Sequence, residues 1–139
     1  MHSRETIGLE EARGALDAIL AAHAEAADER PIAVAVVDDA GELLAFARSG
    51  PGNPLSGSVA IAKAYSAART RSETAELGAR LAQMGVGIGD LADARLTTLQ
   101  GGVPLHGATG ACVGAIGVSG LAATEDEALA RRGVVFVGG

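Results

Sequence analysis

The chain has almost no aromatic side chains. Its 139 residues include one tyrosine, two phenylalanines and no tryptophan, so aromatic residues make up 2% of the sequence. Apolar residues nevertheless reach 48%, a fraction typical of globular rather than disordered proteins. The core must therefore consist of alanine, valine, leucine and isoleucine, whose small side chains let helices and a sheet approach one another closely.

Cysteine and long apolar runs are also scarce. Cys112 is the one cysteine, which excludes an internal disulfide and suits a reducing compartment. Residues 1–5 are polar and lack the apolar stretch of a signal peptide. No apolar run approaches the roughly 20 residues that span a bilayer. These absences favour a cytoplasmic protein with no membrane partner.

Basic residues are outnumbered by acidic ones. Eleven basic and 17 acidic side chains give a formal net charge of −6. Nucleic-acid affinity comes largely from clustered basic side chains, and the nearest approach to a cluster is Arg131–Arg132 or the pair Arg69 and Arg71. We interpret these residues as solvated helix ends and expect no nucleic-acid partner.

Helical periodicity predicts four helices within a single domain that spans residues 1–139. The length suits one core, and the sequence contains no repeat, low-complexity segment or linker. The first helix is predicted from Thr6, as N-cap, to about Asp28, and the second over Ser58–Arg69. The third follows a capping box at Thr70–Glu73 and runs to about Gln83. The fourth follows a second capping box at Thr124–Glu127 and ends at Gly133.

Two hairpins punctuated by glycine are predicted between these helices. The first joins the apolar run Ile32–Val37 to Glu42–Ala47, and the second joins Val103–His106 to Ala111–Val118. A further short strand is expected over Leu96–Leu99. The order of helix, hairpin, helices, hairpin and helix predicts an α/β (α+β) fold with an antiparallel sheet covered by helices.

Several short motifs follow one another in a specific order. They are Val36-Val37-Asp38-x-x-Gly41, Ala62-Lys63-Ala64, Gly101-Gly102-Val103-Pro104, Gly114-x-x-Gly117-Val118-Ser119-Gly120 and Asp126. In order and spacing, these motifs resemble the GlcG/HbpS-like family, which includes haem-binding proteins and the C-terminal domain of PduO-type proteins. The resemblance covers a core of about residues 7–132.

This resemblance implies a profilin-like three-layer domain with about five antiparallel strands between helices. It implies a homo-oligomer, an octamer or smaller, that binds a small molecule near subunit interfaces, with haem or corrinoid as the cofactor. One segment departs from the family pattern, because Ala47–Pro54 replaces the usual Arg-Met-Asp-Gly-Ala-like stretch. If that segment borders the pocket, the ligand could differ from those of other members.

Two histidines are candidate ligands. His23 lies on the apolar stripe of the first predicted helix, and a neutral imidazole can bind iron or cobalt. The resemblance supports this role, because PduO-type domains ligate through a histidine of their first helix. His106 follows Gly101 and Gly102, which would let a ligand approach the backbone. The alternatives are a packing histidine at position 23 and an exposed loop histidine at position 106.

Lys63 is the one lysine in the chain, and it falls in an alanine-rich helix. A buried amine can act as a base or nucleophile, or it can pair with Asp38 or Asp126 or hold a carboxylate ligand. Asp38 itself suits the cap of the turn before Gly41.

Three functions therefore remain open from the sequence. The chain could be a ligand-binding protein that uses His23, His106, Lys63, Gly101 and Gly102. It could be an enzyme that acts on a small oxygenated metabolite through Lys63, with Asp38 or His106 nearby. It could also be a structural or sensory partner protein.

Overall fold

Two largely buried strands form the centre of a four-stranded antiparallel sheet. The computed structural model of the chain describes residues 4–138. Strands β1 (Ala33–Asp38) and β4 (Cys112–Ser119) lie side by side, with Ala33 opposite Ser119 and Asp38 opposite Gly114. The edge strands are β2 (Leu43–Arg48) and β3 (Gly102–His106), which gives the order β2-β1-β4-β3.

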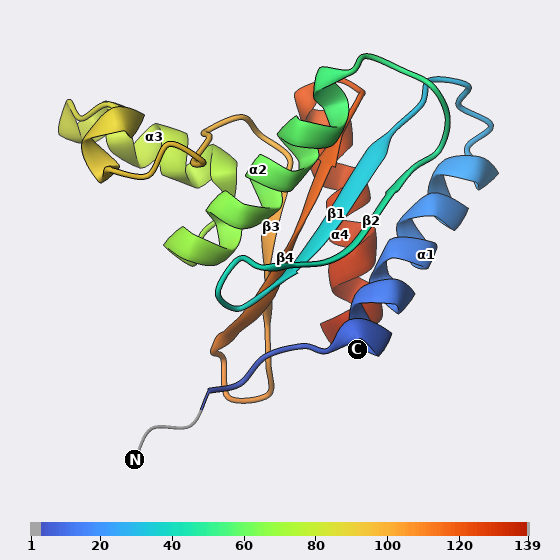
Figure 1. The fold of residues 1–139 in the computed structure, drawn as a ribbon, viewed down its shortest axis with the longest axis horizontal. Coiled ribbons are helices and arrows are strands. Elements are labelled where there is room, and N and C mark those ends of the chain that lie inside the picture. The colour runs from blue at the N-terminus through green and yellow to red at the C-terminus, as the bar shows by residue number, and fades with distance from the viewer. Residues whose placement is uncertain (1–3, 139) are drawn as a thin grey trace.

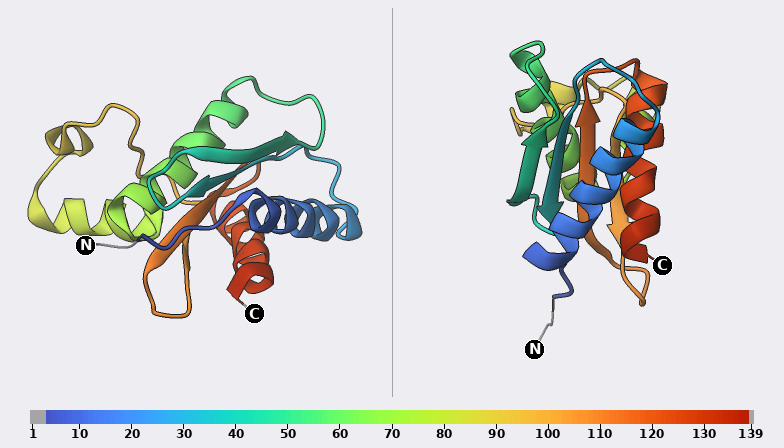
Figure 2. Two further views of the ribbon diagram at one scale, coloured as in Figure 1. Left: turned by 60° about the horizontal axis from the view of Figure 1, so that its bottom comes forward. Right: turned by 90° about the vertical axis from the view of Figure 1, so that its right-hand side faces the viewer.

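Helices cover both faces of the sheet and make three layers (Figures 1 and 2). The helices α1 (Leu9–Glu25) and α4 (Ala123–Gly138) pack on one face, and α2 (Leu55–Thr70) packs on the other. The helix α3 (Thr74–Met84) and the short 3-10 helix η1 (Ile88–Leu91) extend away from the sheet (Figure 1). This arrangement confirms the three-layer α+β fold predicted from the sequence.

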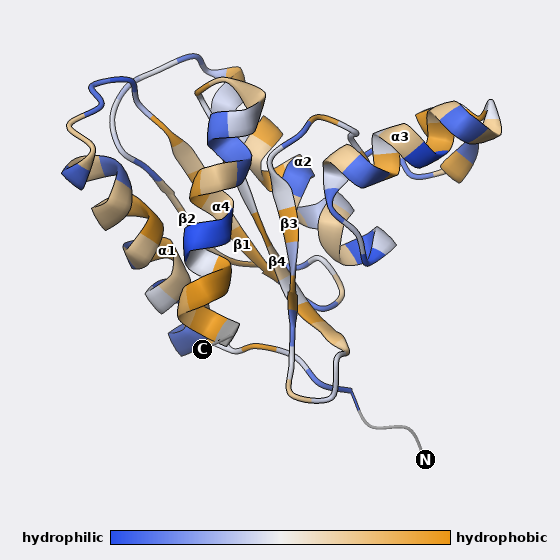
Figure 3. Ribbon diagram, turned by 180° about the vertical axis from the view of Figure 1, so that it is seen from behind, coloured by the Kyte–Doolittle hydropathy of each residue, from blue (hydrophilic) through white to orange (hydrophobic). Residues whose placement is uncertain are grey.

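The two faces of the sheet bury side chains of different size. Larger aliphatic residues such as Val34, Val36 and Ile116 fill the face under α1 and α4. Figure 3 shows hydrophobic residues in orange along β1 and β4. Alanines dominate the face under α2. That helix approaches β4 closely because Gly117 has no side chain: a Cβ atom there would lie 2.1 Å from the carbonyl oxygen of Ala60.

The sheet has four strands within the described residues, so the expectation of about five was too high by one. The segment 96–99 is not a strand. Its Thr97 amide donates to the Oγ atom of Ser66 at 2.8 Å, which ties the segment to α2 instead of to a neighbouring strand. No helix in the described part of the chain combines the length and apolar character needed to cross a bilayer.

Three helix starts differ from the predictions. The first helix begins at Leu9 with Gly8 as N-cap, because the Ile7 amide donates to the carbonyl oxygen of Val113 and keeps the preceding residues extended. The helix expected from Ser58 already begins at Leu55. The capping box predicted at residues 70–73 is wrong, since α2 continues through Thr70 and α3 begins at Thr74.

The last helix differs from the prediction at both ends. It begins at Ala123, where Glu125 accepts a hydrogen bond from the Ala122 amide at 3.2 Å, so the box predicted from Thr124 is out of register. It also continues past Gly133 to Gly138. Gly133 is a packing position: a Cβ atom there would lie 2.6 Å from Cδ1 of Ile116.

Candidate functional site

A buried histidine ends the apolar stripe of α1. His23 is 5% exposed, and its Nε2 atom lies 2.7 Å from the carbonyl oxygen of Arg30. A carbonyl oxygen can accept but not donate a hydrogen bond, so Nε2 carries the proton in this contact. A neutral imidazole that donates through Nε2 has its lone pair on Nδ1, which is the atom that a metal would bind.

The carbonyl group that holds His23 belongs to a well-anchored residue. The Nη2 atom of Arg30 lies 2.6 Å from Oδ2 of Asp28 and 2.8 Å from Oε2 of Glu125. The hydrogen bond to Arg30 lowers the pKa of the Asp28 carboxyl to about 2, and the same guanidinium lowers the pKa of Glu125. Arg30 therefore connects the turn after α1 to the first turn of α4.

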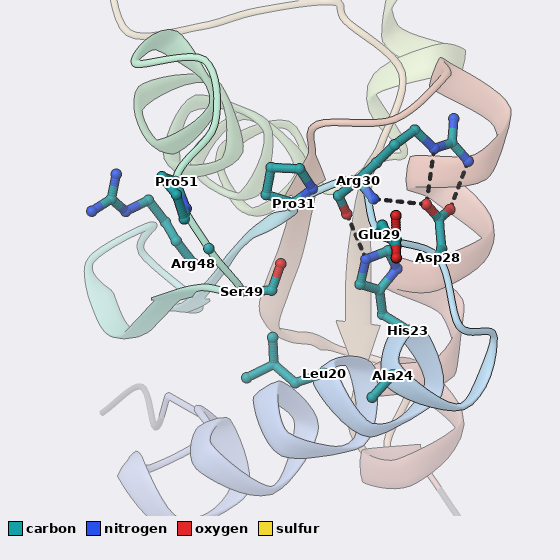
Figure 4. A pocket seen from close by; sticks show the side chains of 11 residues that line it. Leu20, His23, Ala24, Asp28, Glu29, Arg30, Pro31, Arg48, Ser49 and Pro51 are labelled. Carbon is teal, nitrogen blue, oxygen red and sulfur yellow. Dashed lines mark hydrogen bonds and ion pairs between the residues drawn. The ribbon is translucent and has the colours of Figure 1, made fainter.

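A hollow of about 600 Å³ opens beside this turn (Figure 4). Its apolar lining includes Leu20, Ala24, Pro31 and Pro51. Figure 4 shows the ring of His23 on one side of the hollow and Arg48 on the other. The volume falls in the range of about 300–1,000 Å³ that is usual for small-molecule and cofactor sites.

Arg48 is the cation of this hollow that remains free of a carboxylate. Within residues 4–138, its guanidinium has no hydrogen-bond or ion-pair partner, whereas Arg30 is bound to two acids. Arg48 belongs to the segment 47–54, and Ser49, Gly50 and Pro51 of the same segment also line the hollow. That segment thus borders the cavity next to His23.

Lys63 forms a buried ion pair away from this hollow. Its Nζ atom lies 3.1 Å from Oδ2 of Asp126 and donates to the carbonyl oxygen of Val118 at 2.8 Å. Burial raises the pKa of Asp126, and the charge of Lys63 acts against that rise. Of the two partners left open by the sequence, the lysine takes Asp126 and not Asp38.

The two glycines predicted to border a ligand lie against this ion pair. A Cβ atom on Gly101 would lie 2.8 Å from Nζ of Lys63, and one on Gly102 would lie 2.4 Å from the Lys63 carbonyl oxygen. Gly101 also has a φ of +131°. Both glycines are buried, and they accommodate the lysine and its helix.

Asp38 and His106 lie at the opposite end of the sheet from Lys63. Asp38 accepts hydrogen bonds from the amides of Ala40 and Glu42 at 2.9 and 3.0 Å, which confirms that it caps the turn. It pairs with Gly114, four residues along β4 from Val118, and four residues of a strand span roughly 13 Å.

His106 is exposed at the end of β3, opposite Cys112. It lines a separate hollow of about 620 Å³ together with Thr6 and Ile7. Within one chain, the structure therefore does not bring Lys63, Asp38 and His106 together. It also separates His106 from His23.

Four charged residues near His23 were not predicted from the sequence as parts of a site: Asp28, Arg30, Arg48 and Glu125. Arg30 holds His23 through a backbone carbonyl group, which leaves no signature in residue type. The spacing of Asp28 and Arg30 is typical of any charged turn. The sequence singled out the segment 47–54, which contains Arg48. The position of Arg48 at the hollow beside His23 depends on the packing of β2 against α1, which the sequence does not show.

No cluster of three histidine, cysteine, aspartate or glutamate side chains within residues 4–138 could hold a bare metal ion. His23 would therefore have to bind a metal that brings further ligands of its own, as the iron of haem does with its four ring nitrogens. The apolar lining and the imidazole match two parts of such a group, a planar ring and a metal. The guanidinium of Arg48, which Figure 4 shows turned away from His23, would have to reorient to meet its carboxylate substituents.

Comparison with known proteins identifies a family over nearly the whole chain. The family model described as "Haem degrading protein HbpS-like" matches residues 7–135. No curated protein matches the chain.

Solved structures share the fold closely. A double mutant of HbpS from Streptomyces reticuli is 33% identical with a TM-score of 0.87, and the match covers 100% of this chain and 92% of that one. The ORFY protein of Klebsiella pneumoniae is 25% identical with a TM-score of 0.86, over 99% and 94% of the two chains. A PduOC–haem complex, at 22% identity and a TM-score of 0.82 over 94% of each chain, shares the fold.

Proposed function

This chain belongs to the HbpS-like family, and on that premise we propose that it binds haem in the hollow at the end of α1, with His23 as the iron ligand. The observation that carries the proposal is the hydrogen bond between Nε2 of His23 and the Arg30 carbonyl oxygen. Histidines that bind a metal through one nitrogen usually donate the other N–H to a carbonyl or carboxylate group. His23 already has that second contact.

The comparisons support haem as the ligand class. The description of the family model names haem degradation, and the PduOC structure of the same fold is a haem complex. Bound haem would supply an iron centre with reversible axial ligation.

The chain's own residues would divide the work of binding. His23 would supply the axial nitrogen, and Leu20, Ala24 and Pro31 would contact the ring. Arg48 would pair with a propionate, since a guanidinium matches the planar geometry of a carboxylate. Arg30 would be a positioning residue that fixes the His23 ring through its carbonyl group.

A titration of the purified protein with hemin tests the proposal. We expect a saturable shift of the Soret band for the wild type and loss of that spectrum for His23→Ala. His106→Ala is the matched control, because it removes an exposed histidine that lines a different hollow. An unchanged spectrum in His23→Ala, or no shift of the wild type at micromolar hemin, would exclude the proposed site.

Two variants extend the test to the ligand class. Arg48→Met should weaken hemin binding about tenfold, because one charge-assisted hydrogen bond to a propionate is lost, and it should leave the Soret position unchanged. A titration with cobalamin in place of hemin tests the corrinoid alternative. Tighter binding of cobalamin than of hemin would replace haem with corrinoid in the proposal.

We further propose that the chain forms a homo-oligomer, an octamer or smaller. Exposed apolar side chains support association: Leu9 is 54%, Val135 69% and Phe136 55% exposed. Light scattering coupled to size-exclusion chromatography measures the mass against 13.7 kDa for one chain. A monomer at all concentrations would contradict self-association and leave the His23 proposal to its own test.

A further inference from the structure

A third hollow, separate from the hollows beside His23 and His106, lies between α2 and the turn that joins β1 to β2. It has a volume of about 490 Å³. The contributing residues of α2 recur at intervals of three and four positions, so they share one face of the helix. They are Ser58, Ile61, Ala62 and Tyr65.

Part of the lining of this hollow is apolar. It includes Ile61 and Ala62 of α2, Leu43 of the β1–β2 hairpin and Leu96 of the segment after η1. Leu43 is 47% exposed, so the hollow leaves an aliphatic side chain open to water. A ligand with an apolar body would bury that surface favourably.

Arg95 lines the hollow and contacts Tyr65. The guanidinium of Arg95 lies 4.0 Å from the ring centre of Tyr65, within the range of a cation–π contact. Its Nη2 atom donates to the Tyr65 hydroxyl group, and that hydroxyl donates to Asp93. Tyr65 is 3% exposed, so the guanidinium rests against a buried ring.

Arg95 retains free donors in this position. Its Nε atom is 3.7 Å from Oδ1 of Asp93, beyond hydrogen-bond range. Nε and Nη1 have no hydrogen-bond acceptor within residues 4–138, and the side chain is 67% exposed. A guanidinium already held by a hydrogen bond and a cation–π contact binds a carboxylate at a smaller entropic cost than an unrestrained one.

The surrounding charges restrict the number of negative groups that a ligand can carry. Arg69 lies 5.7 Å from the Tyr65 ring centre and adds a second cation near Arg95. Asp93 offsets one of these cations, and Glu42 also lines the hollow. Arg95 can neutralise one carboxylate of a ligand, whereas Glu42 would repel a second carboxylate.

We propose that this hollow is a binding site for a small monocarboxylic acid with an apolar body. Arg95 binds the carboxylate of this ligand. The apolar body of the ligand contacts four aliphatic side chains of the lining: Leu43, Ile61, Ala62 and Leu96. Tyr65 is a positioning residue that acts through Arg95. The site is independent of His23 and of haem.

Phenylacetate is a suitable probe, and its neutral amide, phenylacetamide, is the matched control ligand. By isothermal titration calorimetry, we expect phenylacetate to bind with a Kd of about 1 mM or tighter. Phenylacetamide should bind at least about tenfold more weakly, because it cannot form the charge-assisted pair. Amide signals of residues 61, 62 and 96 should shift in heteronuclear NMR spectra.

Variants separate this site from its alternatives. Arg95→Met should weaken phenylacetate binding at least about tenfold, and Tyr65→Phe should weaken it to a smaller extent. Arg132→Met, which removes an exposed arginine of α4, and His23→Ala should both bind phenylacetate as the wild type does. Circular dichroism confirms that each variant is folded.

Three results would overturn the proposal. The first is equal binding of the acid and the amide, and the second is unchanged binding in Arg95→Met. The third is a combination of two observations: Ile61→Glu dissociates an assembly of the chain, and phenylacetate binds neither the assembled nor the dissociated form. The hollow would then be a contact between copies of the chain instead of a ligand site.

Discussion

The ammonium group of Lys63 lies 3.1 Å from the carboxylate of Asp126, and both side chains are 4% exposed. The pair joins α2 to α4 across the end of the sheet. Removing one partner of a buried pair leaves an uncompensated charge, so Lys63→Met should lower the free energy of unfolding by about 3–5 kcal/mol. Urea denaturation measures this loss.

The matching double variant tests the cause. In Lys63→Met/Asp126→Asn no buried charge remains, and the asparagine can still accept the hydrogen bond that Asp126 takes from the Leu121 amide. We expect the double variant to be more stable than Lys63→Met alone. Equal stability of the two variants would show that packing, and not charge, explains the loss.

Gly101 and Gly110 allow a paired test of the space around that ion pair. Both have a positive φ, +131° for Gly101 and +86° for Gly110. A Cβ atom on Gly110 would have no other atom within 4 Å, whereas a Cβ atom on Gly101 would lie 2.7 Å from the Val118 carbonyl oxygen. Gly110→Ala should cost about 1–2 kcal/mol through backbone strain. Gly101→Ala should cost about 1–3 kcal/mol more through overpacking, and thermal unfolding of both variants measures the difference.

The contact between Asp28 and Arg30 predicts acid sensitivity of the turn after α1. The pKa of Asp28 is lowered to about 2 in the folded chain, whereas an aspartate in an unfolded chain has a pKa of about 3.9. The contact therefore stabilises the fold above about pH 4, and that contribution is lost as the pH falls towards 2. The stability advantage of the wild type over Asp28→Asn should shrink over this interval in urea denaturation.

Arg30→Gln provides the background that tests the cause. Without the guanidinium, adding Asp28→Asn should no longer change the acid dependence of stability. An equal effect of Asp28→Asn in both backgrounds would assign the acid sensitivity to another carboxylate.

Local pattern was sufficient to predict most of the fold. The apolar run that ends at Val37 predicted the buried strand β1, and the alanine-rich stretch around Lys63 predicted the helix that packs on it. Helix ends were predicted less well, because long-range contacts decide them. The Ile7 amide bonds to Val113 and delays α1, and Gly133 packs against Ile116 inside α4 where a helix end was expected.

The candidate site was predictable only in part for a similar reason. The periodicity of α1 placed His23 among buried residues. Nothing in the sequence distinguished Asp38 from Asp126 as the partner of Lys63, since both are aspartates near glycine-rich turns. The contact between His23 and the Arg30 carbonyl group depends on the path of the turn between α1 and β1, which side-chain types do not specify.

The most direct test of the haem proposal is chemical rescue of the axial ligand. His23→Gly removes the imidazole, and free imidazole added to the hemin-loaded variant can take its place. We predict that His23→Gly loses the wild-type Soret spectrum and regains it as imidazole is added, while His106→Gly has the wild-type spectrum throughout. A wild-type spectrum in His23→Gly before imidazole is added would contradict the account.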